Sequence, residues 1–105
     1  MAFKERIRVL VKEPGRRPRQ LEIPNTMEAF QWLVSGFFET IPFDDKSVLI
    51  CNEEGKIKGL RENFRIWNDI IVGTVVLAGA EGEDFTDVPE ASEETFRQIL
   101  EEQKR

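Results

Sequence analysis

The chain has 105 residues, of which 40% are hydrophobic and 33% are charged, and its net charge is −5. This length suits one domain with one core. No apolar run approaches the ~18 residues that a membrane span needs, and the N-terminus lacks the long apolar stretch of a signal peptide, so we expect a cytoplasmic protein without membrane contact.

The first predicted unit is an antiparallel hairpin over residues 5–23. Apolar and basic residues alternate from Phe3 to Lys12, so we expect one buried and one solvent-facing side, with Leu10 as the exception. Residues 14–18 supply proline and glycine for the turn, and alternation resumes after them.

The next predicted unit is a helix from Thr26 to Gly36. Asn25 is its expected N-cap, because an Asn side chain accepts hydrogen bonds from the first-turn amides, and Glu28 lies in the capping-box position. The apolar surface of this helix is broader than one sheet face usually covers. Two explanations stay open: the C-terminal helix packs beside it, or Trp32 lies at a subunit interface.

Two strands are predicted in the middle of the chain. Residues 38–43 indicate an edge strand, because Pro42 cannot donate to a ladder. Residues 47–52 indicate a second strand, which turns at Glu53 and returns from Lys56.

A central strand is predicted over residues 70–78. This segment is apolar at both strand parities, as expected for a strand buried on both faces. Gly73 would leave a notch in it, which another backbone, a side chain or a ligand could approach closely.

An acidic connector and a thin amphipathic helix are predicted to close the chain. Asp87, Pro89 and Glu90 form the expected start of this helix. We interpret residues 1–80 as an α+β core and residues 81–105 as the connector and C-terminal helix of the same single domain. The predicted fold is α+β, with a small antiparallel or mixed sheet of about five strands, one helix packed on it and a C-terminal helix. The opening hairpin followed by a helix is β-grasp-like, which by itself implies no function.

Several of these pieces together carry a family resemblance. They are the strand and turn at residues 7–15, the strand and turn from Val48 to Leu60, the segment from Asp69 to Thr74, and residues 83–85. In order and spacing they are similar to a family of short bacterial and phage proteins known as domain of unknown function 3846, and this resemblance implies no activity.

One motif departs from the family. Its Leu-Pro-x-Asn-Arg pattern is replaced here by the run Leu60-Arg61-Glu62-Asn63-Phe64-Arg65. The Asn matches, whereas the Pro and the adjacent Arg do not, which leaves any role of that Arg in doubt.

The sequence lacks the residue patterns and motifs that usually carry catalysis. The sequence has no histidine, no phosphate-binding glycine motif and a single cysteine, so we predict no catalytic residue, no metal site and no cofactor. Cys51 lies in an apolar strand and is expected to be a reduced structural thiol. The adjacent acids Asp44-Asp45 and Glu53-Glu54 lie in predicted turns, where solvated carboxylates are more common than catalytic ones.

Four polar residues are predicted as a binding surface. Asn52 ends a strand, Asn63 and Arg65 lie in the segment that crosses to the next strand, and Thr74 follows Gly73. These groups could converge at one end of the sheet. The alternative is that the Asn side chains satisfy turn amides and that Thr74 is an ordinary strand residue.

Charge is distributed unevenly along the chain. Residues 1–20 carry seven basic and two acidic side chains, and residues 81–105 carry nine acidic and three basic ones. Both could be solvated faces whose opposite charges bring the two ends together. Alternatively, the hairpin contacts phosphates or the acidic helix engages a basic partner. The net negative charge and the lack of aromatic residues for base stacking in the hairpin argue against nucleic acid.

These observations predict a protein that acts by binding. We expect a non-catalytic binding or regulatory protein of bacterial, phage or plasmid origin that contacts a protein partner. The alternative is a domain that sequesters or senses a small ligand, with a homodimer through Trp32 as one possible assembly.

Overall fold

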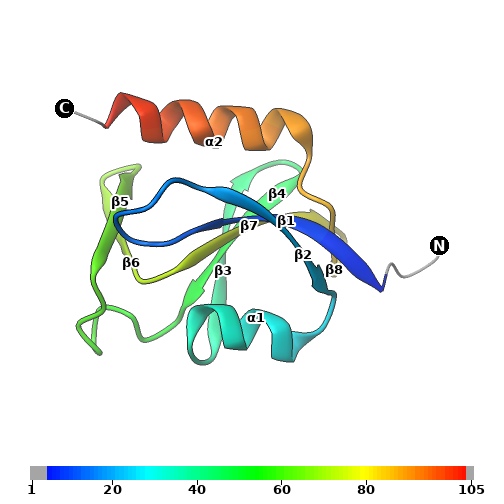
Figure 1. The fold of residues 1–105 in the computed structure, drawn as a ribbon, viewed down its shortest axis with the longest axis horizontal. Coiled ribbons are helices and arrows are strands. Elements are labelled where there is room, and N and C mark those ends of the chain that lie inside the picture. Colours follow the sequence, from blue (N-terminus) through cyan, green and yellow to red (C-terminus); the bar gives the residue numbers. More distant parts are fainter. Residues whose placement is uncertain (1–4, 104–105) are drawn as a thin grey trace.

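The computed structural model describes residues 5–103, and within them an antiparallel sheet lies between two helices (Figure 1). The predicted parity at Phe3 and the last two residues of the expected C-terminal unit lie outside this range. The elements in chain order are β1 (Arg6–Lys12), β2 (Arg19–Pro24), α1 (Met27–Val34), β3 (Phe38–Asp44), β4 (Ser47–Asn52), β5 (Glu62–Ile66), β6 (Asp69–Val72), β7 (Val75–Glu81), β8 (Asp84–Thr86) and α2 (Glu90–Glu102).

The described residues form a six-stranded sheet in the order β2-β1-β7-β4-β3, in which β8 also pairs with β7. Every pairing in it is antiparallel. The predicted hairpin of residues 5–23 is confirmed by the pairing of β1 with β2, and β3 lies at the edge as its Pro42 predicted. The α+β prediction is thereby confirmed.

Strand β7 is central and its side chains enter two hydrophobic cores. Val76 and Ala78 pack under α1 with residues of β1 and β4, whereas Val75 and Leu77 pack on the opposite face under α2 and the β5–β6 hairpin. The apolar residues at both parities therefore have a direct physical reason, since each face of the sheet is covered.

The expected one-sided burial of the first strand holds at Arg6 but is wrong toward the end of the strand, for the same reason. Leu10, which breaks the alternation, is fully buried in the core beneath α2, and Lys12 of the same parity is also buried. Residues of α2 and of the β5–β6 hairpin cover that face, so the end of its predicted solvent-facing side lies in the interior.

The predicted strand of residues 70–78 is divided into β6 and β7. Gly73 adopts a φ of 76°, in the left-handed region that favours glycine, and the chain leaves the line of the strand there. A methyl group at Gly73 would lie 2.8 Å from a methyl carbon of Leu60, so a side chain fills the predicted notch.

The return strand after β4 is also placed differently from the prediction. Residues 53–59 form consecutive turns instead of a strand at Lys56, and β5 begins only at Glu62. Strand β5 then pairs with β6 in a separate two-stranded sheet.

The N-cap of α1 is Thr26, and the expected cap Asn25 is wrong. Thr26 Oγ1 accepts a hydrogen bond from the Ala29 amide at 3.1 Å. Asn25 is buried, and its side-chain amide donates to the carbonyl oxygen of Phe85 at 3.0 Å. A tertiary contact therefore takes the side chain that local sequence assigned to the cap.

The two helices lie on opposite faces of the sheet, so the proposed packing of α2 beside α1 is wrong (Figure 1). Phe30 and Val34 of α1 are buried, whereas Trp32 is 81% exposed on the outer side of the helix. The alternative explanation, an interface at Trp32, stays a prediction.

Candidate functional site

A groove of about 830 Å³ lies between the β1–β2 turn, β5 and the C-terminal half of α2. We call it the basic groove, because five of its lining side chains are cationic and only two are carboxylates. The cations are Lys12, Arg16, Arg17, Arg65 and Arg97, and the carboxylates are Glu62 and Glu101. Its volume is within the ~300–1,000 Å³ of typical ligand sites.

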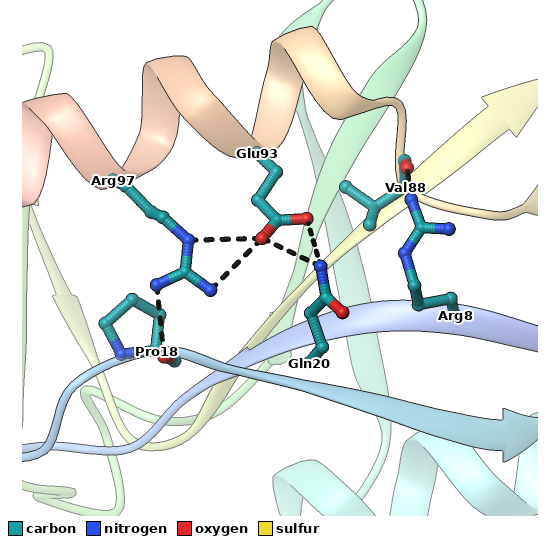
Figure 2. Close-up of polar contacts among 6 residues, drawn as sticks. All are labelled: Arg8, Pro18, Gln20, Val88, Glu93 and Arg97. Atoms are coloured by element: carbon teal, nitrogen blue, oxygen red, sulfur yellow. Dashed lines mark hydrogen bonds and ion pairs between the residues drawn. The ribbon is translucent and has the colours of Figure 1, made fainter.

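A polar network anchors α2 to the hairpin (Figure 2), and two of its residues, Pro18 and Arg97, line the basic groove. Glu93 is buried, and its carboxylate accepts hydrogen bonds from Gln20 Nε2 at 3.0 Å and Arg97 Nε at 3.1 Å. Arg97 also donates from Nη1 to the carbonyl oxygen of Pro18 at 3.3 Å. The guanidinium of Arg97 is thus held between helix and hairpin at the rim of the groove.

The start of the C-terminal unit is tied to β1 by a second set of contacts. Arg8 donates from Nη2 to the carbonyl oxygen of Val88 at 2.6 Å (Figure 2), and its backbone amide donates to Asp87 Oδ1 at 2.8 Å. Asp87, predicted to start the helix, therefore binds β1, and the residue that precedes α2 is Pro89, which makes no side-chain cap.

Asn63 connects three parts of the chain at the floor of the basic groove. Its Nδ2 donates to the carbonyl oxygens of Lys12 at 2.8 Å and Gly73 at 2.7 Å, and its Oδ1 accepts from Lys12 Nζ at 2.8 Å. Burial, together with the charge of Arg61, lowers the pKa of Lys12. The predicted site residue Asn63 therefore supports the groove through structural hydrogen bonds.

We expect Asn63→Ala to lower the free energy of unfolding by about 2–4 kcal/mol. The substitution leaves the Lys12 and Gly73 carbonyls and a buried ammonium without this partner, and each unsatisfied buried group costs ~1–3 kcal/mol. Urea denaturation measures the change. Glu62→Ala, at an exposed neighbour, is the control and should change stability by less than ~0.5 kcal/mol; equal losses in both variants would contradict the assignment.

The four predicted site residues do not form one cluster. Asn63 and Arg65 line the basic groove, whereas Asn52 lines a smaller hollow of about 130 Å³. Asn52 Nδ2 donates to the carbonyls of Val34 and Ser35 at the end of α1. Thr74 is half-buried between β6 and β7. The structure thus brings together Asn63 and Arg65, and it places Asn52 elsewhere.

The thiol of Cys51 lies in the smaller hollow and is poorly suited to attack a substrate. Burial and the carboxylate of Glu39, whose Oε2 is 3.9 Å from Sγ, raise the pKa of Cys51 to about 11. A thiol with this pKa is almost fully protonated at neutral pH. Since the thiolate is the nucleophile, little of the reactive form is present.

The turn carboxylate of Asp44 has a structural role in the fold. Burial acts to raise its pKa, but hydrogen bonds from the hydroxyls of Ser92 at 2.6 Å and Ser47 at 2.7 Å outweigh this and lower the pKa. The side chain thereby joins the β3–β4 turn to α2.

Residues 5–103 contain no cluster of three or more potential metal-ligating side chains. No helix in the described part of the chain is long and apolar enough to cross a membrane.

Sequence reasoning missed the helical side of the basic groove. The cluster of arginines at residues 16–19 was recognisable as a basic surface, but Arg97 lies in a mostly acidic helix and Gln103 caps its end. Their position on the groove follows from how α2 crosses the hairpin, for which the sequence carries no local signal.

The comparisons with known proteins identify a family without an activity. The sequence model of the family described as Domain of unknown function (DUF3846) matches residues 7–101. A search of curated proteins and a search of solved structures found no match.

Proposed function

We propose a non-catalytic binding function for this chain, which belongs to the domain of unknown function 3846 family. In this function, an acidic segment of a partner protein occupies the basic groove. The observation that carries this proposal is the convergence of five cationic side chains from three elements on one groove. Opposite charges across an interface steer association and select partners.

The side chains of Arg17 and Arg65 are available to bind a partner. Arg17 has no hydrogen bond or ion pair with any other residue in the range 5–103. Within residues 5–103, the side chain of Arg65 has only an exposed ion pair with Glu62, at 3.7 Å, and such pairs are worth little in water. Carboxylates from a partner could therefore engage these guanidinium groups at small cost.

The groove suits a protein segment better than a nucleic acid. Glu62 and Glu101 would repel a continuous phosphate backbone, and Phe64, the aromatic residue of the lining, is buried and unable to stack on bases. The net charge of −5 also opposes a long polyanion. A short segment with a few carboxylates avoids these penalties.

The proposal extends to the setting of the protein. We also propose a bacterial, phage or plasmid origin, a cytoplasmic location, and a regulatory role exerted by contact with the partner. The buried free thiol of Cys51 is compatible with a reducing compartment.

Peptide titration tests the proposed function. A fluorescein-labelled seven-residue peptide of alternating Glu and Val is titrated with the full chain, and anisotropy is measured. We expect saturable binding that weakens about tenfold in Arg17→Glu, since the reversal replaces an attraction by a repulsion.

The control is Lys46→Glu, which makes the same charge change at an exposed residue that does not line the groove. It should retain binding within about twofold. Equal weakening in both variants, or no preference over a Lys-Val peptide, would overturn the proposal. Tighter binding of a single-stranded oligonucleotide that displaces the peptide would transfer the site to nucleic acid.

A further inference from the structure

The outer edge of β5 borders the basic groove and has an unusual partner. Trp67 and Asn68 have φ values of 50° and 71° and form the two-residue turn between β5 and β6. The pair Ile66–Asp69 closes this turn, so by the alternation of an antiparallel ladder the next pair, Arg65–Ile70, is not hydrogen-bonded. The amide and carbonyl of Arg65 therefore point away from β6.

Both of these backbone groups bind one side chain from α2. The Arg65 amide donates to Gln103 Oε1 at 3.0 Å, and Gln103 Nε2 donates to the Arg65 carbonyl oxygen. One amide group thus accepts from and donates to the same residue, as the backbone of a neighbouring strand does. Gln103 occupies the place where an additional strand would pair.

This contact is readily exchangeable. Gln103 is the C-cap of α2, and both of its hydrogen bonds with Arg65 are exposed. Releasing the side chain requires no change in a core, and its polar groups can be solvated by water. An incoming strand would restore the two hydrogen bonds that Arg65 loses.

The surroundings define what such a strand would carry. Arg65 is exposed, and Arg97 and Arg17 line the same groove. Residues two apart in a strand point to the same side, so carboxylates at alternate positions could face these cations. The register shift between Glu62 and Phe64 limits pairing toward the start of β5, which leaves Arg65 as the anchor.

We infer that an extended acidic segment of a partner protein adds to the outer edge of β5 and displaces the side chain of Gln103, which acts as an intramolecular stand-in. This inference rests on the proposed function and specifies the conformation of the bound segment and the residue that competes with it. Addition of a strand to an exposed sheet edge is an established mode of peptide recognition.

The first test removes the competitor. In Gln103→Ala we expect the alternating Glu-Val peptide to bind about fivefold more tightly, because two hydrogen bonds no longer have to be exchanged. Gln98→Ala on the same helix is the matched control, since Gln98 is exposed and has no partner within residues 5–103, and its affinity should equal that of the wild type.

The second test reads the backbone pairing directly. Hydrogen exchange at the Arg65 amide is followed by NMR in the full chain. We expect faster exchange in free Gln103→Ala than in the wild type, and slowed exchange when the peptide is bound. A peptide N-methylated at alternate residues, which loses its ladder donors along one edge, should bind at least tenfold more weakly than the unmodified peptide.

The outcomes separate the two proposals. Peptide binding that is sensitive to Arg17→Glu but unaffected by Gln103→Ala and by N-methylation would overturn strand addition and leave the groove function standing. Absence of binding by all acidic peptides would overturn both. Unchanged exchange at the Arg65 amide in free Gln103→Ala would contradict the role of Gln103 as a stand-in.

Discussion

Replacing Val75 with aspartate is expected to unfold the protein. Val75 is 1% exposed in the core beneath α2, and its strand is the centre of the sheet. An unpaired carboxylate there costs several kcal/mol, against a typical total stability of about 5–15 kcal/mol. Circular dichroism during thermal denaturation should show no cooperative transition at 25 °C and above.

Thr40→Asp provides the comparison, because Thr40 is an exposed residue of the edge strand β3 and receives the same carboxylate in a strand. The Thr40→Asp protein should melt cooperatively, at a temperature close to that of the wild type. A soluble Val75→Asp protein with a sharp transition would show that this face of β7 is not the interior that the fold requires.

Gly79→Ala is expected to cost at least 3 kcal/mol, on the order of the larger effects of single substitutions. A methyl group at this position would lie 2.2 Å from the carbonyl oxygen of Asp87 and 2.3 Å from Thr86 Oγ1. The first of these is backbone, so the segment that leads from β8 into α2 would have to move away from β7. Urea denaturation measures the loss.

Gly59→Ala separates this steric effect from the conformational cost of losing a glycine. Gly59 has a φ of 70° and no atom within 4 Å of the added methyl, so only the strain of a left-handed residue applies, about 1 kcal/mol. If Gly79→Ala were no more destabilising than Gly59→Ala, the close approach of the two backbones would be refuted.

The sequence was sufficient for features that depend on periodicity and short-range chemistry. Val76 and Ala78 alternate with Val75 and Leu77, and this double parity correctly predicted the central strand. It could not reveal the break at Gly73, because apolar residues continue on both sides of the glycine, and the side chain that packs against it there belongs to Leu60 of a distant turn.

Local rules failed where two residues could serve the same purpose. Asn25 and Thr26 are both good N-caps, and the choice between them is made by the carbonyl oxygen of Phe85, which the fold brings to Asn25. Propensity ranks the candidates but contains no information about such a partner.

The candidate site was predictable only in part for a related reason. Asn63 and Arg65 were recognised as polar residues in a crossing segment, and both line the basic groove. Arg97 and Gln103 complete it from a helix whose sequence indicates an acidic surface, because the groove is formed by the crossing of α2 over the hairpin and not by any contiguous motif.

The pairing of β1 with β7 has a consequence for the biosynthesis of the protein. Leu10, near the start of the chain, pairs with Leu77, and the core that both residues enter is closed by Phe96. While the ribosome is still translating the last third of the chain, β1 and β2 can pair with each other but lack their central neighbour. Non-local pairings of this kind fold slowly, and exposed strands are prone to aggregation in the interval. Complete folding is therefore expected only once β7 and α2 have emerged from the ribosome, with the nascent β1–β2 hairpin as the segment most in need of chaperone protection.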